Sequence, residues 1–187
     1  MKKIFPIIAI LILATVIFVY QNNKTKNLIV ADYKNATYLI DGQNITLKNG
    51  KAEIETSPGS ASKNVFQYFG NQLKTDLNND GLQDVVFLLT KQTGGSGTFF
   101  YVVAALNTKE GYIGSDGYFL GDRIAPQNIN DSQNPKHKNV IVVNYAERAP
   151  NESFTTQPSI GKSAYLKLDT KTMTWGIVVP DFEGEAK

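Results

Sequence analysis

Hydrophobic and polar positions alternate with a period of two along much of the chain after residue 36. Ile45 and Leu47, for example, are flanked by polar residues on both sides. Two short turn sequences, Asp41-Gly42 and Asn49-Gly50, interrupt the alternation. Alternation is typical of half-buried strands, and Asp-Gly or Asn-Gly between them is a strong hairpin signal. Residues 36–55 are therefore predicted to form a three-stranded antiparallel meander with one face toward solvent.

Two further stretches, residues 85–89 and 99–106, are apolar almost without interruption. Short continuous apolar runs are typical of strands that are covered on both faces. Residues 65–73 fit either a helical face or an extended segment, and we expect them to be extended where they approach residue 76. Additional strands are expected up to residue 179. The fold class predicted from these patterns is mainly β, an antiparallel meander or sandwich-like domain.

The N-terminal segment has a different pattern. Residues 4–20 carry no charge and follow Lys2 and Lys3. As a helix this run would be about 25 Å long, near the lower limit for crossing a bilayer. No small-residue cleavage pattern follows it, which favours an uncleaved transmembrane anchor over the alternative of a cleaved signal peptide. The predicted organisation is an anchor and short tether over residues 1–26 and a β domain over residues 27–187.

Charge and composition exclude several classes of function. Four of the 19 lysines and arginines lie in the first 26 residues, which contain no acid. Residues 27–187 therefore carry 15 basic and 17 acidic side chains, a net charge of −2, which argues against nucleic-acid binding. The chain has no cysteine and one histidine, His137. Disulfides, thiol catalysis and histidine-rich metal sites are thereby excluded within one chain.

The acidic stretch before residue 85 is the strongest candidate site. Oxygen donors stand at alternate positions in it, in the pattern D-x-N-x-D-G that suits calcium. The predicted ligands are the side chains of Asp76, Asn78, Asp80 and Asp84 and the backbone carbonyl of Leu82. Phe87 stands where a true EF-hand has its bidentate Glu, so a weak, structural site is expected. The competing interpretation is a polar turn without metal, since Asn and Asp also favour turns.

The D-x-N-x-D-G-x-x-D stretch resembles the calcium loops of FG-GAP and VCBS-type extracellular repeats, and that resemblance implies the same ligand set. The larger stretch from residue 70 to residue 126 is similar to a group of uncharacterised bacterial envelope proteins. The shared motifs are the acidic loop, Gly94-Gly95-Ser96-Gly97-Thr98-Phe99, Ala104-Ala105-Leu106-Asn107 and Gly121-Asp122-Arg123. This second resemblance implies an exported β domain and no particular activity.

Two classes of function follow from these features. The first is a single-pass membrane protein whose β domain lies outside the cytoplasm, holds a structural calcium ion and binds an envelope protein or polysaccharide. The second is an envelope hydrolase that uses paired carboxylates, with Asp122 and Glu147 as candidates. Each of these acids precedes an arginine, Arg123 or Arg148, so ion pairing at strand ends is the competing role. No nucleophile and base can be paired from the sequence, and a non-enzymatic role is favoured.

Overall fold

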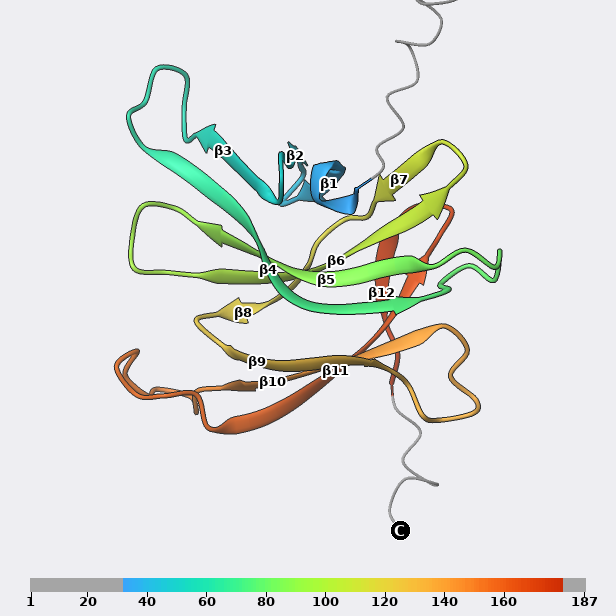
Figure 1. The fold of residues 1–187 in the computed structure, drawn as a ribbon. Helices are drawn as coiled ribbons and strands as arrows, with labels where there is room; N and C mark the ends of the chain where they lie inside the picture. The colour runs from blue at the N-terminus through green and yellow to red at the C-terminus, as the bar shows by residue number, and fades with distance from the viewer. Residues whose placement is uncertain (1–31, 180–187) are drawn as a thin grey trace, which may run out of the picture.

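The computed structural model describes residues 32–179, which form a β structure of three layers (Figure 1). A small two-stranded sheet lies on one face of a six-stranded sheet, and a four-stranded sheet lies on the other face. Every pairing between the strands is antiparallel. The prediction of a mainly β, antiparallel, sandwich-like domain is confirmed.

A single 3₁₀ turn, η1 (Tyr33–Asn35), precedes the strands. The strands are β1 (Thr37–Ile40), β2 (Gln43–Thr46), β3 (Lys51–Glu55), β4 (Lys63–Thr75), β5 (Asp84–Gln92), β6 (Phe99–Thr108), β7 (Gly111–Gly114), β8 (Tyr118–Asp122), β9 (Ala125–Asp131), β10 (Val140–Glu147), β11 (Ile160–Asp169) and β12 (Thr174–Ile177). The central sheet has the order β3-β4-β5-β6-β7, with β8 also paired to β6. The outer sheet has the order β12-β11-β10-β9.

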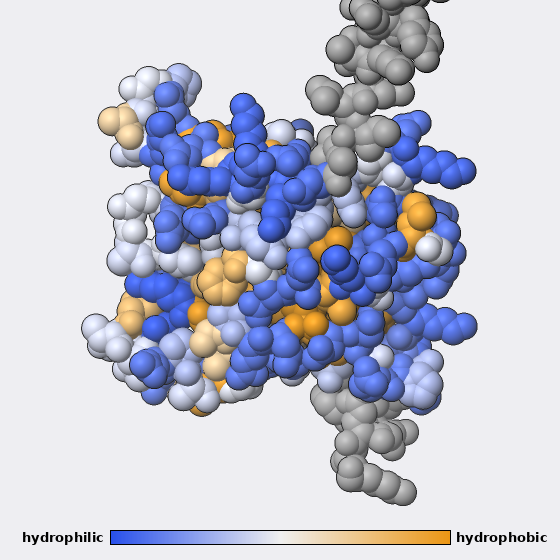
Figure 2. Space-filling view, in the orientation of Figure 1, coloured by the Kyte–Doolittle hydropathy of each residue, from blue (hydrophilic) through white to orange (hydrophobic). Residues whose placement is uncertain are grey.

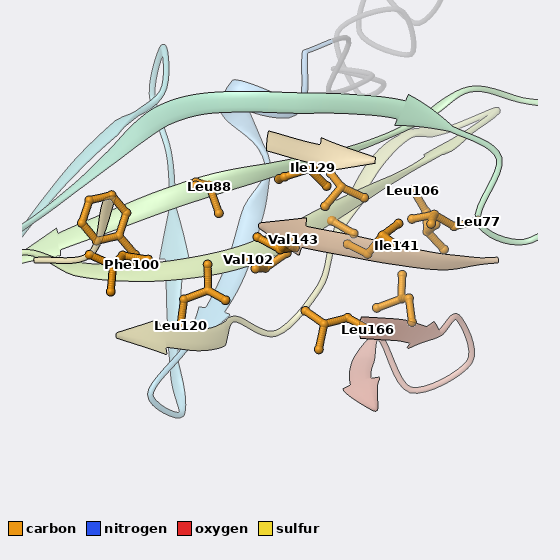
Figure 3. Close-up of a cluster of buried hydrophobic side chains, with 14 residues drawn as sticks. Leu77, Leu88, Phe100, Val102, Leu106, Leu120, Ile129, Ile141, Val143 and Leu166 are labelled. Atoms are coloured by element: carbon orange, nitrogen blue, oxygen red, sulfur yellow. The ribbon is translucent and has the colours of Figure 1, made fainter. Parts of the chain in front are cut away.

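Strands β5 and β6 occupy the middle of the central sheet and are covered on both faces. Side chains of a strand point alternately to opposite faces, so each strand supplies two separate cores. Val86, Leu88, Val102 and Ala104 face the four-stranded sheet, in the core that Figure 3 shows. The intervening residues, such as Phe87, face the β1–β2 hairpin. This arrangement confirms the prediction that both apolar runs are doubly covered strands.

One local prediction is wrong in its strand pairing, and one open alternative is decided. Residues 36–55 do not form one meander, because only β1 and β2 pair with each other and β3 joins β4 in the central sheet. Asn49 and Gly50 still form a turn with positive φ, but this turn carries the chain from one layer to the next. Residues 65–73 lie within the long strand β4, so the extended alternative holds throughout.

The predicted N-terminal transmembrane anchor lies outside the described residues. Within residues 32–179, no helix has the length and hydropathy needed to span a bilayer. On the face in Figure 2, hydrophobic residues form separate patches among hydrophilic side chains rather than one continuous apolar surface.

Candidate metal loop and adjoining groove

The predicted calcium loop connects β4 to β5 and lies at the right-hand end of the sheets in Figure 1. Leu77 fixes this loop to the domain, because its side chain is 3% exposed and belongs to the core between the two larger sheets. Figure 3 shows Leu77 beside Leu106 at one end of that core. Asn79 and Gly81 have φ values of 62° and 83°, so the loop turns sharply through two left-handed residues.

Asp76 organises the loop through its carboxylate. Its Oδ1 accepts N–H groups of Asn78, Asn79 and Asp80 at 3.3, 2.7 and 3.2 Å, and its Oδ2 accepts the N–H of Gly81 at 2.9 Å. These donors stabilise the ionised form, so they lower the pKa of Asp76, with the Gly81 N–H as the largest cause. The first predicted ligand is therefore an anion that the loop is folded around.

Asn78 and Asp80 lie next to Asp76. The Asn78 Oδ1 accepts the N–H of Asp80 at 3.0 Å, and the same N–H also contacts Asp76 Oδ1. Asn78 Nδ2 donates to Asp80 Oδ2 at 2.9 Å, while Leu82 donates its N–H to Asp80 Oδ1 at 2.7 Å. The structure thus brings the side chains of the first three predicted ligands together on one turn, with Leu82 directly after it.

Asp84 turns inward instead. It is fully buried, its Oδ2 accepts the N–H of Leu77 at 2.9 Å, and its Oδ1 accepts the N–H of Asn107 at 2.8 Å. Burial raises the pKa of Asp84, and the two N–H donors oppose that rise. The nearby carboxylates of Asp80 and Asp76 raise the pKa further. This residue joins the loop to β6 as well as being a predicted ligand.

The donor set fits calcium in part. Within residues 32–179, no group of three or more Asp, Glu, His or Cys side chains is placed to hold a metal ion. The predicted set has three acids, of which Asp80 is exposed, Asp76 is partly exposed and Asp84 is buried, and an amide and a backbone carbonyl complete it. Carboxylate oxygens have two lone pairs each, so an oxygen that accepts one N–H retains capacity for a cation. The Asn78 side chain donates an N–H to Asp80, so the partial positive charge of that N–H occupies a position that a cation would otherwise take.

A groove that the sequence did not predict adjoins this loop. It encloses about 620 Å³, and its lining includes Asn78, Asn79, Asn139, Lys167, Lys171 and Trp175. These side chains come from three segments: the acidic loop, the β9–β10 loop and the β11–β12 hairpin. No spacing in the sequence could have revealed the groove, because its walls meet only through the packing of the two large sheets.

The two candidate hydrolase acids have separate partners. Asp122 Oδ2 accepts from Nε and Nη2 of Arg123, and its Oδ1 accepts the N–H of Thr98 at 2.9 Å. Glu147 pairs with Lys162 at 3.2 Å. Neither acid lines the groove described above. Their contacts match the ion-pair role, and the hydrolase assignment stays a prediction that no observation favours.

Comparisons of the chain with protein-family models, with curated proteins and with solved structures found no match.

Proposed function

We propose that this protein is a single-pass membrane protein whose β domain lies outside the cytoplasm, holds a structural calcium ion in the loop from Asp76 to Asp84, and binds an envelope protein or polysaccharide. The observation that supports it best is the convergence of the Asp76, Asn78 and Asp80 side chains on one turn. Calcium prefers oxygen ligands, and a cation would offset the repulsion by which the Asp80 and Asp76 carboxylates raise the pKa of Asp84.

Several features agree with a structural role for the ion. The loop enters β5, the strand at the centre of the molecule. Leu77 holds the loop to the core between the two larger sheets, and Asp84 holds it to β6. A cation here would screen three carboxylates at the start of that strand. Without a bidentate Glu, the expected affinity is about 10⁻⁴ to 10⁻³ M, the range of extracellular modules. Only surroundings rich in calcium would fill such a site.

The location outside the cytoplasm has two supports. One is the uncharged run over residues 4–20, which has the length of a short membrane-spanning helix. The other is the weak calcium affinity expected of the loop. The slight negative charge of residues 27–187 favours an envelope protein or polysaccharide over nucleic acid as the partner.

Thermal unfolding of the full chain in a neutral detergent tests the calcium assignment. At calcium concentrations of roughly 10 to 100 times Kd, binding stabilises the folded state by about 1.4–2.7 kcal/mol, or several degrees in Tm. The gain should disappear with a chelator and shrink in Asp80→Asn, which removes one negative charge at an exposed position and whose fold should persist. Glu110→Gln, on the exposed β6–β7 turn, is the matched control. An unchanged Tm for the wild-type chain at calcium concentrations up to about 100 mM, roughly 100 times the weakest expected Kd, would reject the ion.

A further inference from the structure

The groove beside the acidic loop is built from parts of the chain that are far apart in sequence. Asn139 Nδ2 donates to the backbone carbonyl of Leu77 at 2.9 Å and thereby ties the β9–β10 loop to the acidic loop. The opposite wall is the β11–β12 hairpin, which includes Lys167, Lys171 and Trp175. The result is an open concavity with polar, aliphatic and aromatic walls, and ligands bind preferentially in concave surfaces.

Positive charge dominates the ionisable side chains that line this groove. Lys167 and Lys171 are exposed, and neither takes part in an ion pair within residues 32–179. The acid among the lining residues is Asp169, whose Oδ1 accepts the N–H groups of Lys171 and Thr172. The carboxylates of the metal loop do not line the groove. The Asp169 carboxylate also interacts electrostatically with Lys171, so the lining presents two ammonium groups and one carboxylate to a ligand.

Trp175 gives the groove an aromatic wall. Its backbone N–H donates to Asp116 at 3.1 Å and its ring packs against the core, so the side chain is firmly held. The indole N–H is buried and finds no acceptor anywhere in the part of the chain that the structure describes. A nitrogen without accessible surface is out of reach of a ligand in the open groove, so Trp175 offers a ligand its ring and not its N–H.

We infer that this groove binds an acidic polysaccharide, with the anionic groups of the sugar on Lys167 and Lys171 and a sugar ring against Trp175. Asn78, Asn79 and Asn139 add amide groups, which both donate to and accept from hydroxyls. The inference rests on the binding role in the proposed function and names its partner class. It does not require the metal loop to hold calcium.

Trp175 also supplies the assay, because it is the single tryptophan of the chain. The full chain in a neutral detergent is titrated with a galacturonic acid oligosaccharide, in the presence of a chelator, while tryptophan emission is recorded. We expect a saturable change in emission, and little change with a neutral glucose oligosaccharide of equal length. Lys167→Gln and Lys171→Gln should each weaken binding roughly fivefold, the effect of one exposed ion pair.

Lys162→Gln is the matched control, because Lys162 lies on the same strand as Lys167, pairs with Glu147 and does not line the groove. Its affinity should equal that of the wild type, and circular dichroism checks that every variant folds. Calorimetry detects a complex that leaves emission unchanged. No emission change and no heat with the acidic sugar overturns the inference, as does equal binding of the neutral sugar or of polyglutamate.

The two proposals can fail separately. Sugar binding is measured in chelator, so a missing calcium effect on Tm leaves the groove result intact. A calcium-dependent Tm without sugar binding rejects the groove assignment alone.

Discussion

Asp76 and Asp84, the carboxylates at the two ends of the acidic loop, have opposite electrostatic surroundings. Asp76 receives four N–H donors near the surface, and its pKa is lowered. Asp84 is fully buried, and burial raises its pKa despite two N–H donors. Position in a motif therefore does not fix what an acid contributes, because that depends on the donors and the solvent around each oxygen.

Asp84→Asn should destabilise the domain without any metal present. The substitution replaces one acceptor oxygen by an NH₂ group that faces a backbone N–H of Leu77 or Asn107. A buried donor left without an acceptor costs about 1–3 kcal/mol. Urea unfolding in chelator should show this loss, and Asp80→Asn, at an exposed position, should show a much smaller one. Equal effects of the two variants would contradict the buried role assigned to Asp84.

The lowered pKa of Asp76 predicts a pH dependence of stability. Because the folded-state pKa lies below the ordinary value of 3.8, the carboxylate favours folding above that pH. This contribution is lost as the pH falls through the folded-state pKa. Asp76→Asn should therefore be less stable than wild type at neutral pH, and the difference should shrink in acid. Urea unfolding in chelator between neutral pH and about pH 3 measures it. A difference that does not change with pH would refute the assignment.

At the scale of the element, the β1–β2 hairpin is docked on the central sheet by close backbone contact. Leu39 donates its N–H to the carbonyl of Ser115 at 3.1 Å and accepts the N–H of Gly117 at 2.9 Å. A Cβ at Gly114 would lie 2.2 Å from the carbonyl oxygen of Thr37 and 2.7 Å from the ring of Tyr38. The hairpin can cover β5 and β6 only where this glycine allows it.

Gly114→Ala should therefore push the hairpin away from the sheet. Overpacking of this kind costs about 1–3 kcal/mol, and contact with rigid backbone places the effect at the upper end. Gly161→Ala is the control, since a Cβ there meets nothing within 4 Å and the backbone needs no left-handed conformation. Thermal unfolding should show a large loss for the first variant and almost none for the second. Similar unfolding midpoints for the two variants would show that the β1–β2 hairpin is not held against Gly114.

Element types were more predictable from the sequence than element partners. The apolar runs of β5 and β6 identify buried strands, because hydrophobic character at successive positions requires cover on both faces. The turn at Asn49 and Gly50 is also visible, but a turn does not determine which strand pairs with the next. β3 pairs with β4, and β7 and β8 both pair with β6 instead of with each other. Such choices depend on long-range packing, as does the groove around Trp175.

At the scale of the whole molecule, the shared strands β5 and β6 should make the three layers unfold together. Val102 and Val103 are neighbours on β6 and both are fully buried, but they lie in different cores. Val102→Ala and Val103→Ala should each cost roughly 2 kcal/mol, from lost burial and the cavity left behind. Trp175 packs on the Val102 side, so its emission reports the outer sheet directly.

The informative variant is Val103→Ala, because Val103 faces the hairpin and not the sheet that carries Trp175. If β5 and β6 couple the layers, tryptophan emission and far-UV circular dichroism should give one coincident transition, shifted equally in both variants. A tryptophan midpoint that stays at the wild-type value in Val103→Ala would mean that the hairpin layer opens alone. The coupled outcome follows from the topology, since disrupting either face of β6 disturbs the strand on which both cores are built.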